Sequence, residues 1–304
     1  MTRAALYDST GGPEVLHVEE VTDAAPGPGE VAVRVRAAGL NPYDSKVRLG
    51  AVPSQAPFPR RIGSDLAGTV EAVGPDALYW DGTPAAVGDE VLGSGRGSVA
   101  QRAIASAKNL TRRPESLPVE VAGALNVAAL TALSCLVTVP VGEGDTVLVG
   151  GASGAVGFIA AQLAIGAGAR AIGTSSERSF DLLRSVGIEP VAYGDGLAER
   201  LASFPPVTAV FDCHGREALD AGVAVGVPVD RMVAIAAYGA LDEIGAHNVE
   251  RTARTAANLA VLAESVADGR LVVPIAATFP LDEVVAAFTQ LESSHAPGKI
   301  VVRP

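Results

Sequence analysis

Hydrophobic and polar residues alternate clearly in the first third of the chain. Residues 31–35 place an apolar residue at every second position, which predicts a half-buried strand. A turn cluster at 26–29 precedes this strand, and further strand-like runs occur at 68–73 and 90–92. With glycine frequent up to residue 97, the pattern predicts a mainly β region with irregular loops.

The pattern changes near residue 118, where an Ala- and Leu-rich helical stretch begins. From residue 145 onward, predicted strands alternate with predicted helices, and residues 146–149 are mostly apolar, as in a strand covered on both faces. Alternating β and α segments predict a parallel, doubly wound sheet. Strands are expected at 146–149, 169–173, 209–211 and 232–236, and helices at 154–167 and 177–185.

The last part of the chain is predicted to return to the β-rich region. A helix is expected near 251–267, another at 281–291 and a final strand at 299–302. We therefore predict an α/β protein with two domains. Residues 1–117 and 268–304 would form the β-rich domain, and residues 118–267 the nucleotide-binding type of domain.

Composition narrows the class of protein. With 304 residues, 48% of them hydrophobic, the chain is long enough for a substantial core and is not disordered. Its net charge of −11 disfavours nucleic acid as a partner. Two cysteines cannot form a disulfide framework. Without a signal-like start or a long unbroken apolar run, we expect a cytoplasmic protein that does not enter the membrane.

The most informative segment is a glycine-rich turn between a predicted buried strand and an apolar helix. Residues 147–158 read VLVGGASGAVGF, which contains the pattern A-x-G-x-x-G, with Ala152 where the usual fingerprint has glycine. Backbone N–H groups of such a turn and the dipole of the following helix bind a pyrophosphate. The flanking strand and helix supply the expected context. The alternative is a tight turn without a ligand.

The end of the next predicted strand indicates which dinucleotide binds. An NAD site usually has Asp or Glu here to bind the ribose 2′-hydroxyl. This sequence has Ser175, Ser176 and Arg178, which suit a 2′-phosphate and favour NADPH over NADH. Glu177 is interpreted as the start of the next helix, where a carboxylate is favourable. Capping of that helix by the serines is an alternative that is compatible with phosphate binding.

Seven segments together resemble the medium-chain dehydrogenase/reductase superfamily, in its zinc-independent quinone oxidoreductase (zeta-crystallin-like) branch. They are GPEVL at 12–16, PGEV at 28–31, GLNPYDSK at 39–46, GSDLAG at 63–68, VGDEV at 87–91, LTA at 130–132 and PGKIV at 297–301. The resemblance implies a GroES-like β domain split by a Rossmann domain, with the active site in the cleft between them. It also implies a homodimer that pairs Rossmann sheet edges, for which residues 232–236 and a following strand at 241–244 are candidates.

The residues at the metal-binding positions of the family argue against zinc. Relatives with zinc carry a Cys in the loop matching 41–44 and a His-Glu pair after the glycine that matches Gly63, where this chain has Ser64 and Asp65. No cysteine occurs at 88–115, the region of the structural zinc lobe, and the four histidines share no ligand spacing. Without a Lewis acid, simple alcohol oxidation is disfavoured, and hydride transfer to an enone, enal or quinone is favoured.

The resemblance implies that NADPH supplies the hydride while the protein positions the acceptor and supplies a hydrogen-bond donor and a proton. Candidates are Asn41, as donor to the acceptor oxygen, and Tyr43 and Lys46, as donors of a hydrogen bond or proton. Alternatively, Asn41 and Pro42 form only a turn, and Asp44, for which we favour a structural role, pairs with Lys46. Ser64 and Asp65 either line the cleft or form a structural pair.

Cofactor contacts implied by the resemblance are distributed over the Rossmann domain and the C-terminal strand. Thr131 would contact the carboxamide or ribose end, and Ala236, Ala237 and Tyr238 the nicotinamide. The remaining candidates are Ala152, Ser153, Gly154, Ala155 and Val156 at the pyrophosphate, Ser175, Ser176 and Arg178 at the 2′-phosphate, Tyr193 beside the adenosine phosphate, and Lys299.

Two other functions are compatible with these residues. The chain could be a tailoring reductase that acts on one intermediate of a biosynthetic pathway. It could also be a non-catalytic NADPH-binding sensor or structural protein, although Asn41 and Lys46 argue against this.

Overall fold

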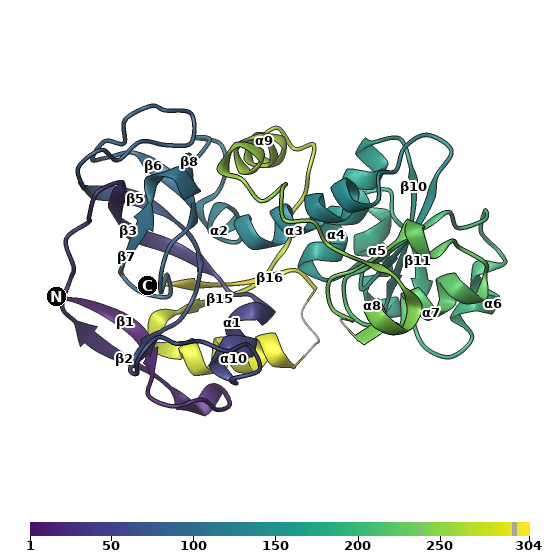
Figure 1. Ribbon diagram of the computed structural model, residues 1–304, viewed down its shortest axis with the longest axis horizontal. Coiled ribbons are helices and arrows are strands. Elements are labelled where there is room, and N and C mark those ends of the chain that lie inside the picture. The colour runs from purple at the N-terminus through teal and green to yellow at the C-terminus, as the bar shows by residue number, and fades with distance from the viewer. Residues whose placement is uncertain (238, 294–296) are drawn as a thin grey trace. The chain divides into compact units, whose positions relative to one another are not determined.

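The computed structural model describes residues 1–237, 239–293 and 297–304, and the chain divides into two units (Figure 1). Unit 1 contains Met1–Val127, Thr255–Arg270 and Pro274–Pro304. Unit 2 contains Ala128–Arg254 and Leu271–Val273. The α/β class and the parallel doubly wound sheet predicted from the sequence are confirmed. Over the described residues, no helix is both long and apolar enough to cross a membrane.

Unit 2 is built on a parallel sheet in the order β11-β10-β9-β12-β13-β14. The strands are β9 (Thr146–Gly150), β10 (Arg170–Ser175), β11 (Glu189–Ala192), β12 (Ala209–Asp212), β13 (Met232–Ala234) and β14 (His247–Asn248). The chain starts at β9, moves outward through β10 to β11, and crosses back to β12 on the other side of β9. The carboxyl ends of β9 and β12 therefore flank the switch point at which such sheets bind ligands.

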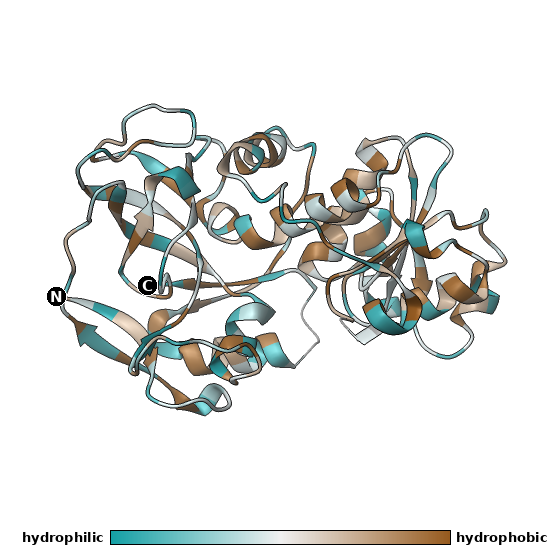
Figure 2. Ribbon diagram, viewed as in Figure 1, coloured by the Kyte–Doolittle hydropathy of each residue, from teal (hydrophilic) through white to brown (hydrophobic). Residues whose placement is uncertain are grey.

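Helices join the strands of this sheet. They are α3 (Asn126–Thr138), which begins in unit 1, α4 (Ala155–Gly166), α5 (Phe180–Arg184), α6 (Leu197–Leu201), α7 (Glu217–Ala224) and α8 (Gly239–Ile244), with 3-10 turns η3 (Glu177–Ser179) and η4 (Val229–Arg231). Every residue of β9 is buried, as its apolar run predicts. Hydrophobic residues dominate α4, which packs against β9 and β10 (Figure 2).

The predicted strand at 241–244 is wrong, because these residues belong to α8. Leu241 and Ile244 are three positions apart, so a helix places both on one face, and both pack against the core of unit 2. The strand beside β13 is instead β14, whose two residues are exposed.

The described residues of unit 1 form two sheets. The smaller sheet has three strands in the order β2-β1-β4. They are β1 (Thr2–Tyr7), β2 (Leu16–Val21) and β4 (Arg60–Arg61). The larger sheet runs β15-β16-β3-β5-β6-β8, with β7 also paired to β3. Its strands are β3 (Glu30–Gly39), β5 (Asp65–Val73), β6 (Glu90–Ser94), β7 (Arg102–Ser106), β8 (Leu110–Arg112), β15 (Ile275–Pro280) and β16 (Lys299–Arg303).

The predicted alternation in β3 corresponds to burial. Val33 and Val35 are buried, whereas Arg34 and Arg36 are exposed on the other face. The C-terminal strand β16 pairs antiparallel with β3 and so brings Lys299 to the end of β3.

The helices of unit 1 are α1 (Pro42–Arg48), α2 (Val119–Gly123), α9 (Ala256–Ala267) and α10 (Val284–Glu292), with 3-10 turns η1 (Pro13–Val15), η2 (Ala107–Asn109) and η5 (Leu281–Glu283). The helix predicted near 251–267 begins only at Ala256, because the Thr255 hydroxyl caps it by accepting the N–H of Asn258 at 3.2 Å.

Candidate active site

The glycine-rich turn of unit 2 leads from β9 directly into the start of α4. Gly154 is the N-cap of this 12-residue helix and has no side chain to occupy the first N–H groups. The N–H of Gly154 donates to Gly151 O at 3.0 Å, which closes the turn. A Cβ at Gly157 would lie 2.5 Å from Gly151 O, so only glycine fits where the helix passes the turn. The turn can therefore hold a pyrophosphate against the helix start.

Thr174 on β10 fixes the turn from the neighbouring strand. Its Oγ1 accepts the N–H of Gly151 at 2.9 Å, and its carbonyl accepts the N–H of Ala152 at 2.9 Å. Sequence reasoning did not identify Thr174. The signal available was a hydroxyl residue near the end of an otherwise apolar strand that neighbours the glycine turn.

Ala152 stands where the usual fingerprint has a glycine, and its methyl group has room because the facing residue on β10 is a glycine. Its methyl group is fully buried, and a Cβ at Gly173 would lie 2.5 Å from the Cβ of Ala152. The space that a side chain at Gly173 would need is thus filled by the Ala152 methyl group.

The predicted 2′-phosphate residues follow the end of β10. Ser175 is buried and its hydroxyl donates to Ser176 O at 3.1 Å, while Ser176 is half-buried and precedes the 3-10 turn η3 without a capping hydrogen bond from its side chain. Arg178 is exposed and makes no ion pair with the residues that the structure describes. Tyr193, 59% exposed, donates its N–H to Ser175 O at 3.4 Å, so the adenosine-side candidates lie together.

The nicotinamide-side candidates lie on other parts of unit 2. Thr131 is buried on α3, and Ala236 and Ala237 are half-buried in the segment after β13. Tyr238 lies outside the described residues. The N–H groups of Ala236 and Ala237 donate to Oδ2 of Asp212, a buried residue that sequence reasoning missed. The available signal was a carboxylate that ends an apolar strand beside the glycine turn.

In unit 1, a buried polar cluster lies where β3 runs into α1. Lys299 Nζ donates to Leu40 O at 2.8 Å and to Asn41 Oδ1 at 2.6 Å, and lies 3.7 Å from Asp65 Oδ2. Asn41 Nδ2 donates to Asp65 Oδ2 at 3.1 Å and to Gly39 O at 3.4 Å. All three side chains are at least 97% buried. Burial lowers the pKa of Lys299, and the carboxylates of Asp65 and Asp44 oppose this shift.

Asp65 also holds the beginning of α3. Its carboxylate accepts Asn126 Nδ2 at 3.0 Å and the N–H of Val127 at 3.2 Å. The adjacent Ser64 has a buried hydroxyl without a hydrogen-bond partner among the described residues. Asp65 therefore connects β5, α1 and α3 within unit 1, as a structural residue would.

The remaining candidates of the loop differ in exposure. Asp44 is buried, and its Oδ2 accepts the N–H of Asn41 at 2.9 Å at the start of α1. Burial, reinforced by Asp65, raises the pKa of Asp44 to about 7. Tyr43 is 56% exposed, and Lys46 is half-buried. Tyr43 and Lys46 thus offer donors at the surface of unit 1, whereas Asn41 and Asp44 lie beneath them.

Among the described residues, no group of three or more His, Cys, Asp or Glu is arranged to hold a metal ion. Cys135 is buried and Cys213 is less so, and both are free thiols. The cluster consists of the amide of Asn41, the carboxyls of Asp44 and Asp65 and the ammonium group of Lys299, a set that contains no thiolate or imidazole ligand.

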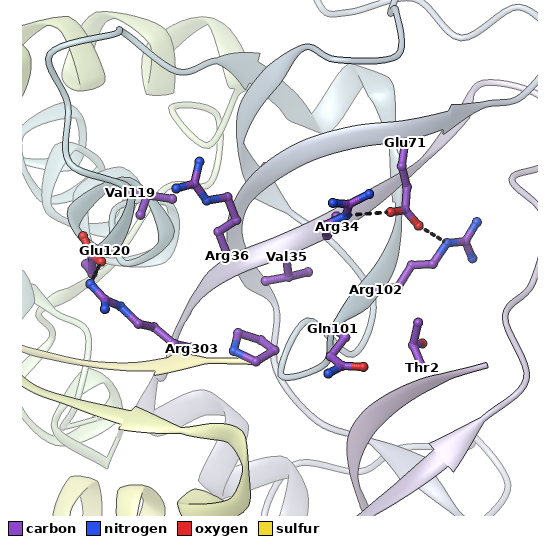
Figure 3. A pocket seen from close by; sticks show the side chains of 11 residues that line it. Thr2, Arg34, Val35, Arg36, Glu71, Gln101, Arg102, Val119, Glu120 and Arg303 are labelled. Atoms are coloured by element: carbon purple, nitrogen blue, oxygen red, sulfur yellow. Dashed lines mark hydrogen bonds and ion pairs between the residues drawn. The ribbon is translucent and has the colours of Figure 1, made fainter.

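A groove of about 610 Å³ opens elsewhere on unit 1, and none of the predicted site residues lines it (Figure 3). Four arginines face it, but each is near a carboxylate. Arg34 and Arg102 share Glu71 at 3.2 and 2.7 Å, Arg303 pairs with Glu120, and Arg36 lies 3.6 Å from Glu90. Three carboxylates thus compensate the four arginines only in part, because Glu71 serves two of them and Glu90 also pairs with Arg113 at 3.1 Å.

Comparisons with known proteins identify relatives of this chain. Residues 27–124 match the alcohol dehydrogenase GroES-like domain, and residues 198–302 match a family described as zinc-binding dehydrogenase. A quinone oxidoreductase of Pseudomonas aeruginosa is 30% identical, with both chains covered completely. An NADPH-dependent alkenal/one oxidoreductase of Arabidopsis thaliana chloroplasts is 30% identical over 99% of this chain and 79% of its own. A mycobacterial protein solved with NADPH superposes with a TM-score of 0.87 at 29% identity over the full length of both chains.

Proposed function

The chain belongs to the medium-chain dehydrogenase/reductase superfamily, in its quinone oxidoreductase branch, and is an oxidoreductase with NADPH as its cofactor; from this premise we propose that it transfers hydride to a quinone or an α,β-unsaturated carbonyl compound. The GroES-like domain and the Rossmann-type domain of that family account for its α/β fold. The observation that carries the proposed acceptor class is the polar cluster around Asn41, which contains two carboxyls but no thiolate or imidazole ligand.

The composition of this cluster supports catalysis without zinc. An alcohol must lose a proton as it loses hydride, and a metal ion usually stabilises the alkoxide. A quinone or enone is already electron-poor, so hydride can add once the acceptor is held in place and water is excluded. Negative charge then develops on the acceptor oxygen, and a hydrogen-bond donor placed beside it stabilises that charge.

We assign the donor side of this chemistry to the start of α1. Lys299 donates to Oδ1 of Asn41, which fixes the orientation of the amide and directs its N–H groups away from the lysine. The N–H that contacts Gly39 O at 3.4 Å makes the weaker of the two contacts of Nδ2. In this proposal, that N–H donates to the acceptor oxygen in place of Gly39 O, and Tyr43 or Lys46 supplies the proton.

We assign the following cofactor contacts to residues of unit 2. NADPH supplies the hydride when it is bound. The first N–H groups of α4, from Gly154 to Val156, bind the pyrophosphate, and the exposed guanidinium of Arg178 binds the 2′-phosphate together with Ser175 and Ser176. Tyr193 flanks the adenosine, and Thr131, Ala236 and Ala237 contact the nicotinamide end. The protein is further proposed to be a cytoplasmic homodimer.

The deciding experiment is NADPH and NADH oxidation after treatment with a chelator. The acceptor panel contains a quinone, a 2-alkenal, a cyclic enone and a simple aldehyde. We expect turnover of the first three classes with NADPH, unchanged by chelation. Activity on the aldehyde that the chelator abolishes would contradict the zinc-free mechanism. NADPH binding without turnover of any acceptor would favour a dedicated pathway substrate or a sensor.

Variants of α1 then test the proposed donors. Tyr43→Phe or Lys46→Ala should lower kcat by roughly 10²-fold if the changed residue supplies the proton. Lys108→Ala is the matched control, because Lys108 is an exposed lysine of the same unit outside the proposed site. Equal activity in all three variants would contradict the assignment of the proton donor.

A further inference from the structure

Asp212 is a buried carboxylate at the switch point of the sheet in unit 2. It is the last residue of β12, is fully buried, and is paired in register with Gly150 of β9 and Ala234 of β13. It therefore lies between the glycine turn and the segment that follows β13.

Both carboxylate oxygens of Asp212 are used by backbone donors. Oδ1 accepts the N–H groups of His214 at 2.9 Å and Gly215 at 2.7 Å. Oδ2 accepts those of Ala236 at 3.2 Å and Ala237 at 2.8 Å. One side chain thus joins the loop after β12 to the segment after β13.

A carboxylate is the side chain that this arrangement requires. It can accept four hydrogen bonds, and four N–H dipoles offset the cost of burying its charge. An asparagine has one oxygen, and its NH2 group would oppose two of the four N–H donors. The main chain strengthens the connection, since Ile235 N–H donates to Asp212 O at 3.0 Å and Cys213 N–H to Gly150 O at 3.2 Å.

We propose that Asp212 is a positioning residue that holds residues 235–237 in the conformation that receives the nicotinamide half of NADPH. This inference rests on the proposed placement of the nicotinamide beside Ala236 and Ala237. Asp212 would act through the backbone and would not itself contact the cofactor.

The position of Asp212 makes this role separable from binding of the adenosine half. Ser175 ends β10 and Arg178 follows it, on the opposite side of β9 from β12. Loss of the Asp212 carboxylate should therefore disturb the nicotinamide side and leave the 2′-phosphate side intact.

The test compares two ligands in the full-length protein, NADPH and 2′-phospho-ADP-ribose, which lacks the nicotinamide. In Asp212→Asn, we expect the Kd for NADPH to rise about tenfold or more, since a misplaced positioning segment loses its contacts with the ligand. The Kd for 2′-phospho-ADP-ribose should stay within about twofold of the wild-type value. Equal weakening of both ligands, or no change in either, would overturn the proposal.

Asp145→Asn is the matched control. Asp145 precedes β9 at the opposite end of the sheet, and its carboxylate accepts from Thr208 Oγ1, Arg231 Nη2 and the N–H of Gly142 at 2.7, 2.8 and 3.0 Å. Its loss should lower stability without changing the ratio of the two dissociation constants. A changed ratio in this control would show that any damage to unit 2 produces the effect, and would overturn the proposal.

Ala237→Pro gives a second variant in case Asp212→Asn does not fold. Proline removes one of the four N–H donors and leaves the carboxylate with three. The same selective loss of NADPH binding is expected, and unchanged NADPH binding would contradict the proposal. These binding measurements need no acceptor. If the protein reduced no quinone or enone, the proposed function would be disproved, but the two dissociation constants would still decide the role of Asp212.

Discussion

Lys299 and Asn41, 258 residues apart in sequence, are joined by a buried hydrogen bond of 2.6 Å from Nζ to Oδ1. The same ammonium group donates to Leu40 O and lies 3.7 Å from a carboxylate oxygen of Asp65. The last strand of unit 1 thereby fixes the amide at the start of α1, the helix that carries Tyr43 and Lys46. Stability of the fold and geometry of the proposed site consequently depend on the same buried lysine.

Replacing Lys299 by methionine should strongly destabilise unit 1. Asp65 would keep a buried negative charge without its cationic partner, and loss of one partner of a buried pair typically costs about 3–5 kcal/mol. Denaturant unfolding measures this cost. Lys108→Met, at an exposed lysine of the same unit, should change stability by no more than about 0.5 kcal/mol. Adding Asp65→Asn should recover part of the loss, and a double variant as unstable as the sum of the single variants would argue against a direct pair.

The raised pKa of Asp44 predicts that stability falls as pH rises. This pKa is about 7 in the folded protein, against an ordinary value of 3.8. Between about pH 4 and 7, folding therefore takes up a proton, and stability decreases by at most about 1.4 kcal/mol per pH unit from this group. Below pH 4 both states are protonated, and above pH 7 both are ionised, so the contribution becomes constant. Asp65 and Lys299 are the charged groups that act on Asp44 in this cluster.

Asp44→Asn isolates this effect. An asparagine stays neutral and its oxygen can still accept the N–H of Asn41. Unfolding free energies measured at pH 4.5, 6 and 8 should show a flatter profile than the wild type, with the largest relative gain at pH 8. An identical slope in the variant and the wild type would show that Asp44 does not titrate in this range.

Most of the secondary structure could be predicted because the hydrophobic pattern that indicates which residues are buried is set by neighbouring positions in the sequence. The alternation in β3 and the apolar run of β9 each depend on neighbouring residues. The error at 241–244 arose because four residues with apolar ends fit a short strand as well as a helical turn. Only the packing of Leu241 and Ile244 on one face distinguishes the two.

The partners of the candidate site residues could not be predicted in the same way. The glycine turn is a continuous segment, and its pattern includes the strand and helix that confirm it. The Asn41 cluster instead joins residues 24 and 258 positions apart, which no local pattern relates. Lys299 was identified from the family resemblance as a cofactor residue, whereas the structure places its ammonium in the buried cluster of unit 1. Its proposed contact with NADPH stays a prediction.

Gly173→Ala should damage the glycine turn through Ala152. The new Cβ would lie 2.5 Å from the Ala152 Cβ and 2.8 Å from Ile188 Cγ2, and such overpacking costs about 1–3 kcal/mol. We expect a lower Tm and weaker NADPH binding. Adding Ala152→Gly removes the closer contact, so the double variant should be more stable than Gly173→Ala alone. No recovery in the double variant would contradict the view that Ala152 fills the space above Gly173.

Arg178→Ala should reduce the preference for NADPH over NADH. Arg178 is exposed after β10 and makes no ion pair within the described part of the chain, so its guanidinium is available for a 2′-phosphate. A hydrogen bond to a charged group contributes about 1.5–3 kcal/mol, which corresponds to roughly a tenfold to hundredfold loss of kcat/KM for NADPH. The value for NADH should be nearly unchanged, because NADH lacks that phosphate.

Arg184→Ala serves as the control for this prediction. Arg184 is exposed on α5 in the same unit and already pairs with Asp181 at 3.1 Å, so its removal changes the net charge equally without removing a proposed phosphate ligand. A general electrostatic effect of unit 2 would lower NADPH use to the same extent in both variants, whereas direct recognition affects Arg178→Ala alone. An unchanged NADPH preference in Arg178→Ala would leave Ser175 and Ser176 as the recognition groups and remove Arg178 from the site.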